Sequence, residues 1–123
     1  MAKVILDTNF IMNAVREKFD FFEGILIMGH QVLIPKEVLA ELERLSKQAP
    51  SKKDKDIAAF SLKIIKANGH EIVSCPGRYV DRGIISYLED KPEYILATYD
   101  KGLKKKVTNR ILVLRGKKKL EIV

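Results

Sequence analysis

The chain has 123 residues, of which 46% are hydrophobic, and this length and composition fit one folded domain, residues 1–123, with a core of its own. Its formal net charge of +7 favours polyanionic partners such as nucleic acids. No apolar run approaches the roughly 20 residues of a membrane span, and the first residues lack the features of a signal peptide, so we expect a cytoplasmic protein with no membrane partner.

Cysteine and histidine are scarce. Cys75 is the only cysteine, which excludes an internal disulfide and favours a buried, unreactive thiol. His30 and His70 lack the spacing of zinc ligands, and we expect both in loops or at strand edges. These observations argue against a zinc site and against a nucleophile activated by histidine.

Hydrophobic patterns divide the chain into alternating strands and helices. Val4, Ile5 and Leu6 form a continuous apolar run, which is typical of a strand covered on both faces. In chain order, the patterns predict a strand at 3–6, helices at 8–18 and 20–29, a strand at 31–34, a helix at 35–48 with Pro35 at its first position, a loop at 49–55, a helix from 56 to a left-handed cap at Asn68 and Gly69, a strand at 70–74, a helix at 79–90, a strand at 93–99, a short helix at 100–107 and a strand at 109–115.

This alternation predicts an α/β domain with a largely parallel, five-stranded sheet and helices on both faces, because parallel neighbours need crossover connections. In such sheets, ligands bind beyond the carboxyl ends of the strands. Asp7 directly follows the first predicted strand and therefore stands at such an end.

Two aspartates follow predicted strands in the same way. Asp7 ends the first strand, where the alternative role for Asp7 or Thr8 is to cap the next helix. Asp100 ends the strand at 93–99, and capping is its alternative role too. Thr98 lies two residues earlier on the same face, so its hydroxyl and the Asp100 carboxylate are expected to converge on one ligand.

Asp81 lies near the start of the helix predicted at 79–90. At about 100° per residue, Ile84, Ile85 and Leu88 centre on nearly the direction of Asp81, so a carboxylate heads the apolar face. Capping of its own helix explains the position of Asp81 but not this direction.

Glu41 lies on the helix predicted at 35–48, roughly 90° from the centre of its apolar stripe. From there a side chain reaches over the sheet edge. Glu37 and Glu43 point further out, and we expect them to be surface charges.

Four carboxylates around one sheet edge would repel one another. Two like charges about 4 Å apart cost roughly 4 kcal/mol at an effective dielectric constant near 20, so such a cluster raises pKa values or recruits a cation. An all-oxygen set of ligands suits Mg²⁺ or Mn²⁺ better than zinc or copper.

Basic residues are concentrated near the end of the sequence. The segment 101–119 holds nine Lys or Arg residues and no acidic residue. Such a run is either a solvated face or a surface for the phosphate backbone of a nucleic acid.

Taken in order, four segments resemble the PIN-domain nucleases, and the resemblance covers nearly the whole chain. They are ILDTNFIMN with Asp7 and Asn9, IPKEVLAELERL with Glu41, YVDRGIISYL with Asp81, and YILATYDKGLKKK with Thr98 and Asp100. The segments CPGRYVD and ATYDKGLKKKV look most like the branch whose member in the small-subunit processome cuts precursor ribosomal RNA.

The resemblance implies a three-layer α/β/α sandwich and a metal-dependent endoribonuclease that leaves a 5′-phosphate and a 3′-hydroxyl. One or two Mg²⁺ or Mn²⁺ ions would be held mainly by Asp7, Asp81 and Asp100, with Glu41 holding an ion or its water. Asn9 and Thr98 would be supporting residues, Asn9 by fixing the rotamer of Asp7. The RNA backbone would be bound by Lys101, Lys104, Lys105, Lys106 and Arg110.

The chain departs from the family at two positions. Many members carry a further acid just after Asp100 or beside Asp81, where this sequence has Gly102 and Arg82. This difference leaves one-ion chemistry, or a loss of activity, open.

Two other functions fit the same sequence. One is a toxin ribonuclease whose antitoxin would occupy the acidic cleft, and the other is a non-catalytic RNA-binding protein that works with ribosome-assembly factors. A homodimer agrees with the resemblance.

Recognition of bases is not expected, because the chain has no tryptophan and Tyr79 and Tyr99 are expected to be packing residues.

Overall fold

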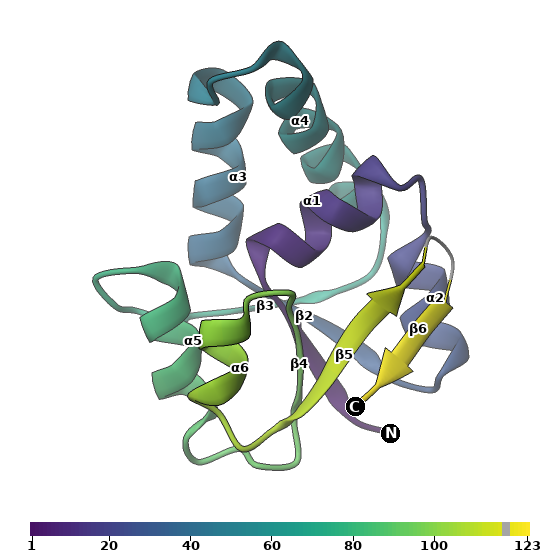
Figure 1. The fold of residues 1–123 in the computed structure, drawn as a ribbon, viewed down its shortest axis with the longest axis vertical. Helices are drawn as coiled ribbons and strands as arrows, with labels where there is room; N and C mark the ends of the chain where they lie inside the picture. Colours follow the sequence, from purple (N-terminus) through teal and green to yellow (C-terminus); the bar gives the residue numbers. More distant parts are fainter. Residues whose placement is uncertain (117–118) are drawn as a thin grey trace.

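The computed structural model describes residues 1–116 and 119–123. Lys117 and Lys118, which belong to the basic segment 101–119, lie outside the described residues. Helices flank a mainly parallel sheet, as the alternation of elements predicts (Figure 1).

The sheet has six strands in the order β3-β2-β1-β4-β5-β6. The strands are β1 (Lys3–Leu6), β2 (Gln31–Pro35), β3 (Glu71–Val73), β4 (Ile95–Ala97), β5 (Arg110–Arg115) and β6 (Lys119–Ile122). The first five run parallel, and β6 pairs antiparallel with β5. Strand order reverses between β1 and β4, so the carboxyl ends of these two neighbours form the topological switch point at which ligands bind in such sheets.

Helices follow most strands. They are α1 (Thr8–Arg16), α2 (Phe21–Ile27), α3 (Lys36–Gln48), α4 (Lys52–Ala67), α5 (Val80–Leu88) and α6 (Lys101–Lys105). The helices α1, α3 and α4 contact one another, whereas α5 and α6 lie together in another part of the structure (Figure 1). Right-handed crossovers in opposite directions along the sheet explain this separation.

The strands next to the switch point are buried on both faces. Val4, Ile5 and Leu6 of β1 have no exposed surface, as their continuous apolar run predicts. Phe10 of α1 covers them and stacks on Tyr99 with the ring centroids 5.8 Å apart. Asp7, which follows β1, is therefore attached to a well-packed backbone that is shielded from water.

The predictions for cysteine and histidine are confirmed. Cys75 is a free, buried cysteine, and burial together with the charge of Glu37 raises the pKa of its thiol to about 12. His30 and His70 both lie in loops, just before β2 and β3.

The structure corrects the start of α4 and two caps. Residues 52–55, predicted as loop, belong to α4, because the Ser51 side chain accepts a hydrogen bond from the Asp54 N–H at 3.1 Å and caps the helix there. Pro35 ends β2 and precedes α3 instead of opening it. Asn68 is extended instead of left-handed, and its side chain donates to the Ile64 carbonyl at 2.8 Å.

The prediction of five strands misses β6. Lys119 is exposed and the other three residues of β6 are only partly buried, so the hydrophobic pattern of this strand is weak. Gly116, directly after β5, adopts a φ of 58°, a conformation that glycine allows at a turn. The backbone of β5 then supplies the hydrogen bonds that make residues 119–122 a strand.

The loop before α5 is held close to the rest of the chain. The Glu37 carboxylate accepts a hydrogen bond from the Cys75 N–H at 2.8 Å, so Glu37 is not the simple surface charge that the helical pattern predicts. Gly83 of α5 lies so near that a Cβ atom there would collide with the Cys75 carbonyl oxygen. These contacts fix the start of α5, where Asp81 lies.

We predict that Gly83→Ala lowers the free energy of unfolding by about 1–3 kcal/mol, because the added methyl group forces the backbone apart. Gly69→Ala is the matched control, since a Cβ atom there meets nothing within 4 Å and the substitution is expected to be neutral or slightly stabilising. Urea denaturation of both variants measures the difference. Equal stability would contradict the close approach of α5 to Cys75.

Candidate active site

A pocket of about 460 Å³ lies at the carboxyl ends of β1 and β4. Its lining includes Asp7, Asn9, Glu41, Asp81, Asp100 and Lys106. The four predicted carboxylates come from four separate segments, yet the fold brings them to one concavity at the topological switch point.

Asp7 is the buried member of this group, with 7% of its surface exposed. Its N–H donates to the Ala97 carbonyl at 3.1 Å, and its Oδ2 accepts a hydrogen bond from the Thr98 hydroxyl at 2.7 Å. Its side chain makes no capping hydrogen bond to α1, a helix that the structure describes throughout. Capping therefore does not explain Asp7, and its carboxylate is tied to β4.

Burial raises the pKa of Asp7 above its usual value. The hydrogen bond from the Thr98 hydroxyl and the nearby Thr8 backbone lower this pKa, and the negative charges of Glu41 and Asp100 raise it further. These two carboxylates are thus close enough to Asp7 to act on it electrostatically.

Asp100 caps α6 and also faces the pocket. Its Oδ1 accepts a hydrogen bond from the Leu103 N–H at 3.1 Å, so the capping alternative is confirmed for this residue. A carboxylate has several acceptor sites, and capping leaves the second oxygen available. A Cβ atom at Gly102 would lie 3.2 Å from Oδ1, so a side chain at position 102 would be adjacent to this carboxylate.

Thr98 connects the two aspartates. Its hydroxyl donates to Asp7 and accepts from the Asp100 N–H at 3.0 Å, while the side chain is completely buried. The Thr98 hydroxyl thus makes two bonds inside the protein and is not part of the pocket lining, while its convergence with Asp100 on one ligand stays a prediction. Asn9, predicted to fix the Asp7 rotamer, lines the pocket as an exposed residue, and Thr98 makes that contact instead.

Asp81 is partly exposed at the start of α5 and lines the pocket. Its Oδ1 accepts a hydrogen bond from the Arg82 N–H at 3.0 Å, so it satisfies one open amide of its helix as well. Ile84 and Leu88 on the same side of α5 are buried. The apolar face thus faces the core, and Asp81 lies where that face reaches the sheet edge.

Glu41 lies on α3 with 31% of its side chain exposed and lines the pocket. Arg44 is its partner in an ion pair with an N···O distance of 3.9 Å. Glu43, predicted to be a surface charge, is exposed and pairs with Lys47 at 3.5 Å. Glu41 thus lines the pocket whereas Glu43 lies at the surface of the same helix, so Glu43 can serve as a control for substitutions of Glu41.

The predicted basic residues divide into two groups. Lys106 lines the pocket, and Lys101, Lys104 and Lys105 lie on α6 beside it. Arg110 begins β5 and therefore lies at the amino-terminal ends of the parallel strands, opposite the acidic pocket. There it lines another pocket with Lys3 and His30. The fold does not bring Arg110 to the four carboxylates.

Tyr79 and Arg82 line the acidic pocket too, and sequence reasoning missed both. It assigned Tyr79 to packing and treated Arg82 as a departure from a family pattern. The available signal is their proximity in sequence to Asp81, since both lie within two residues of that predicted site residue at the start of α5.

The donor chemistry of the pocket fits a hydrated hard cation. Within residues 1–116 and 119–123, no three His, Cys, Asp or Glu side chains stand close enough to hold an ion directly. Mg²⁺ keeps several waters and needs only one or two protein carboxylates, so a set of spaced carboxylates in one pocket suits it. Relief of the repulsion felt by Asp7 would favour its binding.

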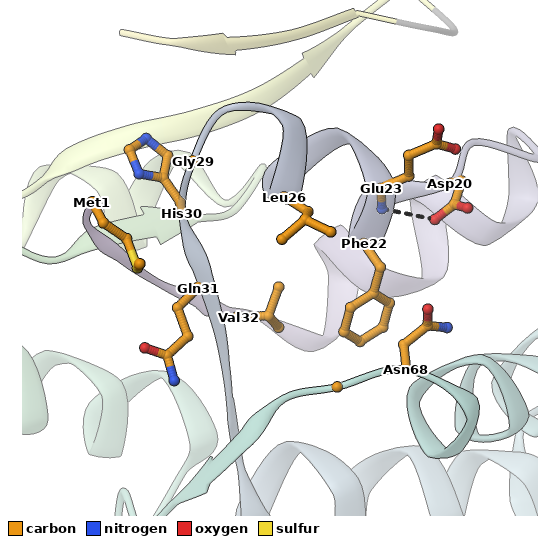
Figure 2. A pocket seen from close by; sticks show the side chains of 11 residues that line it. Met1, Asp20, Phe22, Glu23, Leu26, Gly29, His30, Gln31, Val32 and Asn68 are labelled. Carbon is orange, nitrogen blue, oxygen red and sulfur yellow. Dashed lines mark hydrogen bonds between the residues drawn. The ribbon is translucent and has the colours of Figure 1, made fainter.

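A larger cavity of about 630 Å³ lies beside α2 and lacks such chemistry (Figure 2). Phe22, Leu26 and Val32 supply apolar surface. The acids of its lining, Asp20 and Glu23, both come from the start of α2, where the Asp20 side chain accepts a hydrogen bond from the Glu23 N–H at 3.0 Å (Figure 2). His30 Nδ1 accepts from the Ala2 N–H at 3.0 Å. Size alone therefore does not identify the functional pocket.

The helices that the structure describes include none with the length and apolarity needed to cross a bilayer.

Comparison with known proteins agrees with the geometry. Residues 4–117 match a family described as PIN like domain. The chain is 32% identical to ribonuclease VapC4 of Methanocaldococcus jannaschii, with 99% of this chain and 97% of that protein covered. It is 33% identical over 85% of its length to the rRNA-processing protein fcf1 of Schizosaccharomyces pombe, and it spans about half of that relative, 52%.

A solved structure shares the fold closely. The PIN domain endonuclease Utp24 superimposes with a TM-score of 0.79 and 30% identity, covering 98% of this chain and 90% of that one. The family match over nearly the whole sequence, the full-length relative and the common fold lead to one conclusion. This chain belongs to the PIN-like domain family.

Proposed function

We propose that the chain is a metal-dependent endoribonuclease and that the acidic pocket is its active site. The observation that carries this proposal is the gathering of Asp7, Glu41, Asp81 and Asp100 in one pocket at the switch point of the sheet, next to Lys106. The names of the relatives, a ribonuclease and an endonuclease, support the same class of reaction.

Asp7, Asp81 and Asp100 would hold one or two Mg²⁺ or Mn²⁺ ions directly or through bound waters, and Glu41 would hold an ion or its water. An ion in such a site lowers the pKa of water and offsets the negative charge of a phosphate under attack.

The side chains of the protein position the substrate and the donors. Thr98 holds the Asp7 carboxylate by its Oδ2, and the cap of α6 holds that of Asp100, so neither rotates freely. Lys106 at the pocket and the lysines of α6 neutralise the RNA backbone as it approaches the acids.

Maturation of ribosomal RNA is the setting we propose, because the chain resembles fcf1 in sequence and Utp24 in both sequence and fold. Its similarity to VapC4 over nearly the entire length favours a toxin ribonuclease as the second candidate. A small antitoxin that copurifies with the chain would favour that candidate, and cleavage confined to precursor ribosomal RNA would favour the first.

In an RNA cleavage assay with Mn²⁺, we predict that Asp7→Asn removes activity and that Glu41→Gln lowers the rate by about 10- to 100-fold, as losses around metal ligands do. Glu43→Gln is the matched control on the same helix, because Glu43 pairs with Lys47 at the surface. Equal cleavage by the native chain and Asp7→Asn would reject the site, and equal loss in both glutamate variants would reject the role of Glu41.

We also predict that Asp7→Asn melts at a higher temperature than the native chain at neutral pH in the presence of a chelator. Burial raises the pKa of Asp7 in the folded state, so the ionised form costs stability above that pKa and the cost disappears below the unfolded value of about 3.9. The asparagine keeps an acceptor for the Thr98 hydroxyl without the charge. Melting curves from pH 3 to 8 measure the difference, and a variant that melts lower at pH 7 would contradict the argument.

Added Mn²⁺ is predicted to raise the melting temperature of the native chain by several degrees, since a ligand at a hundred times its Kd stabilises the folded state by about 2.7 kcal/mol. Asp81→Asn should reduce this shift, because it removes a donor from the pocket. Asp90→Asn, an exposed acid paired with Lys91, is the control that should leave the shift unchanged. An undiminished shift in Asp81→Asn would count against a shared ion.

A further inference from the structure

Tyr79 presents an exposed ring at the wall of the acidic pocket. Its exposed fraction is 56%, and it lines the pocket together with Asp81 and Asp100. In the part of the chain that the structure describes, Phe60 is the other aromatic side chain with this exposure, and it lies by a different pocket on α4. An open aromatic face beside a phosphate-binding site is a surface on which a nucleobase can stack.

The other tyrosines are used inside the fold. The Tyr99 hydroxyl donates to the Leu114 carbonyl at 2.8 Å, and its ring stacks on Phe10. Tyr87 and Tyr94 pack against each other with centroids 6.3 Å apart. By contrast, the Tyr79 hydroxyl has no hydrogen-bond partner among the residues described, so neither end of this side chain serves the core.

Two arginines accompany the Tyr79 ring. The guanidinium carbons of Arg78 and Arg82 lie 5.7 and 5.9 Å from its centroid, within the range of cation–π attraction. Both side chains are exposed, and Arg82 lines the pocket. A planar guanidinium stacks on bases and also binds phosphate, so the three side chains form a positively charged aromatic surface next to four acids.

The backbone that carries this surface is held in place by the rest of the chain. The Tyr79 carbonyl accepts a hydrogen bond from the Gly83 N–H at 3.1 Å, and a Cβ atom at Gly77 would lie 2.9 Å from the Gly83 nitrogen. The hydrogen bond from Cys75 to Glu37 anchors the same loop to α3. A base that stacks on the ring therefore does not have to order the loop backbone, which lowers the entropy cost of binding.

Resting on the proposed ribonuclease function, we propose that Tyr79, Arg78 and Arg82 form a platform that stacks an unpaired base of the RNA beside the phosphate in the acidic pocket. A base inside a duplex has neighbours on both faces and cannot reach the ring, whereas a base in a single strand, loop or bulge can. This assignment replaces the expectation that Tyr79 is a packing residue, whereas the expectation that base identity is not recognised stands, because stacking tolerates every base.

The test measures binding separately from cleavage. The Asp7→Asn chain with Mg²⁺ is titrated, by fluorescence anisotropy, into a labelled single-stranded RNA of mixed sequence and into a strand of equal length whose nucleotides are abasic. The platform predicts tighter binding of the base-bearing strand. Adding Tyr79→Ala should weaken that binding about 5- to 100-fold and leave the abasic strand unaffected, since one stacked base contributes on this scale.

Two further variants separate stacking from other causes. Tyr79→Phe keeps the ring and should bind as the parent does, and Phe60→Ala removes an equally exposed ring elsewhere and should change nothing. Melting temperatures of all variants check folding, which substitution of an exposed ring should leave intact.

Equal affinity of the parent for the two strands, or equal weakening of both by Tyr79→Ala, would overturn the platform. If the native chain still cleaves RNA and Asp7→Asn does not, the proposed function would survive that result. Conversely, base-dependent binding through Tyr79 without any cleavage by the native chain would reject the nuclease while supporting a base-binding surface.

Discussion

The hydroxyl of Thr98 is the contact on which the acidic pocket depends. It donates to Asp7 at 2.7 Å and accepts from the Asp100 N–H at 3.0 Å, so a single buried oxygen joins the ends of β1 and β4. These strands are parallel neighbours at the point where strand order reverses. Parallel pairing brings the two aspartates to one edge, and the hydroxyl then fixes the buried carboxylate in its orientation.

The pocket concentrates negative charge in a protein of net charge +7. Burial and the charges of Glu41 and Asp100 raise the pKa of Asp7, which means that the fold accepts an unfavourable charge at this place. Functional sites commonly cost stability in this way, because an arrangement suited to a ligand is strained without it. Lys106 lines the pocket and further lysines lie on α6, the helix that Asp100 caps, so the site is suited both to a cation and to a polyanion.

Much of this arrangement is readable from the sequence, and the exceptions have physical reasons. Continuous apolar runs identified the buried parallel strands, and the aspartates after two of them marked the functional edge. Arg110 belongs to the basic segment in the sequence. It is the first residue of β5, however, and the pocket lies at the carboxyl ends of the parallel strands, so the length of the strand separates Arg110 from the pocket. The roles of Thr98 and Tyr79 depend on which neighbour occupies each side, and a one-dimensional pattern contains no such information. The strand β6 exists because β5 offers it an edge.

Convergence of Asp7, Asp81 and Asp100 on a shared divalent ion is the central claim, and anomalous X-ray scattering from a crystal soaked in Mn²⁺ tests it directly. The account predicts a manganese peak inside the pocket, coordinated by these carboxylates or by waters that they hold. A peak only at other carboxylates, or none in the pocket at saturating Mn²⁺, would contradict it.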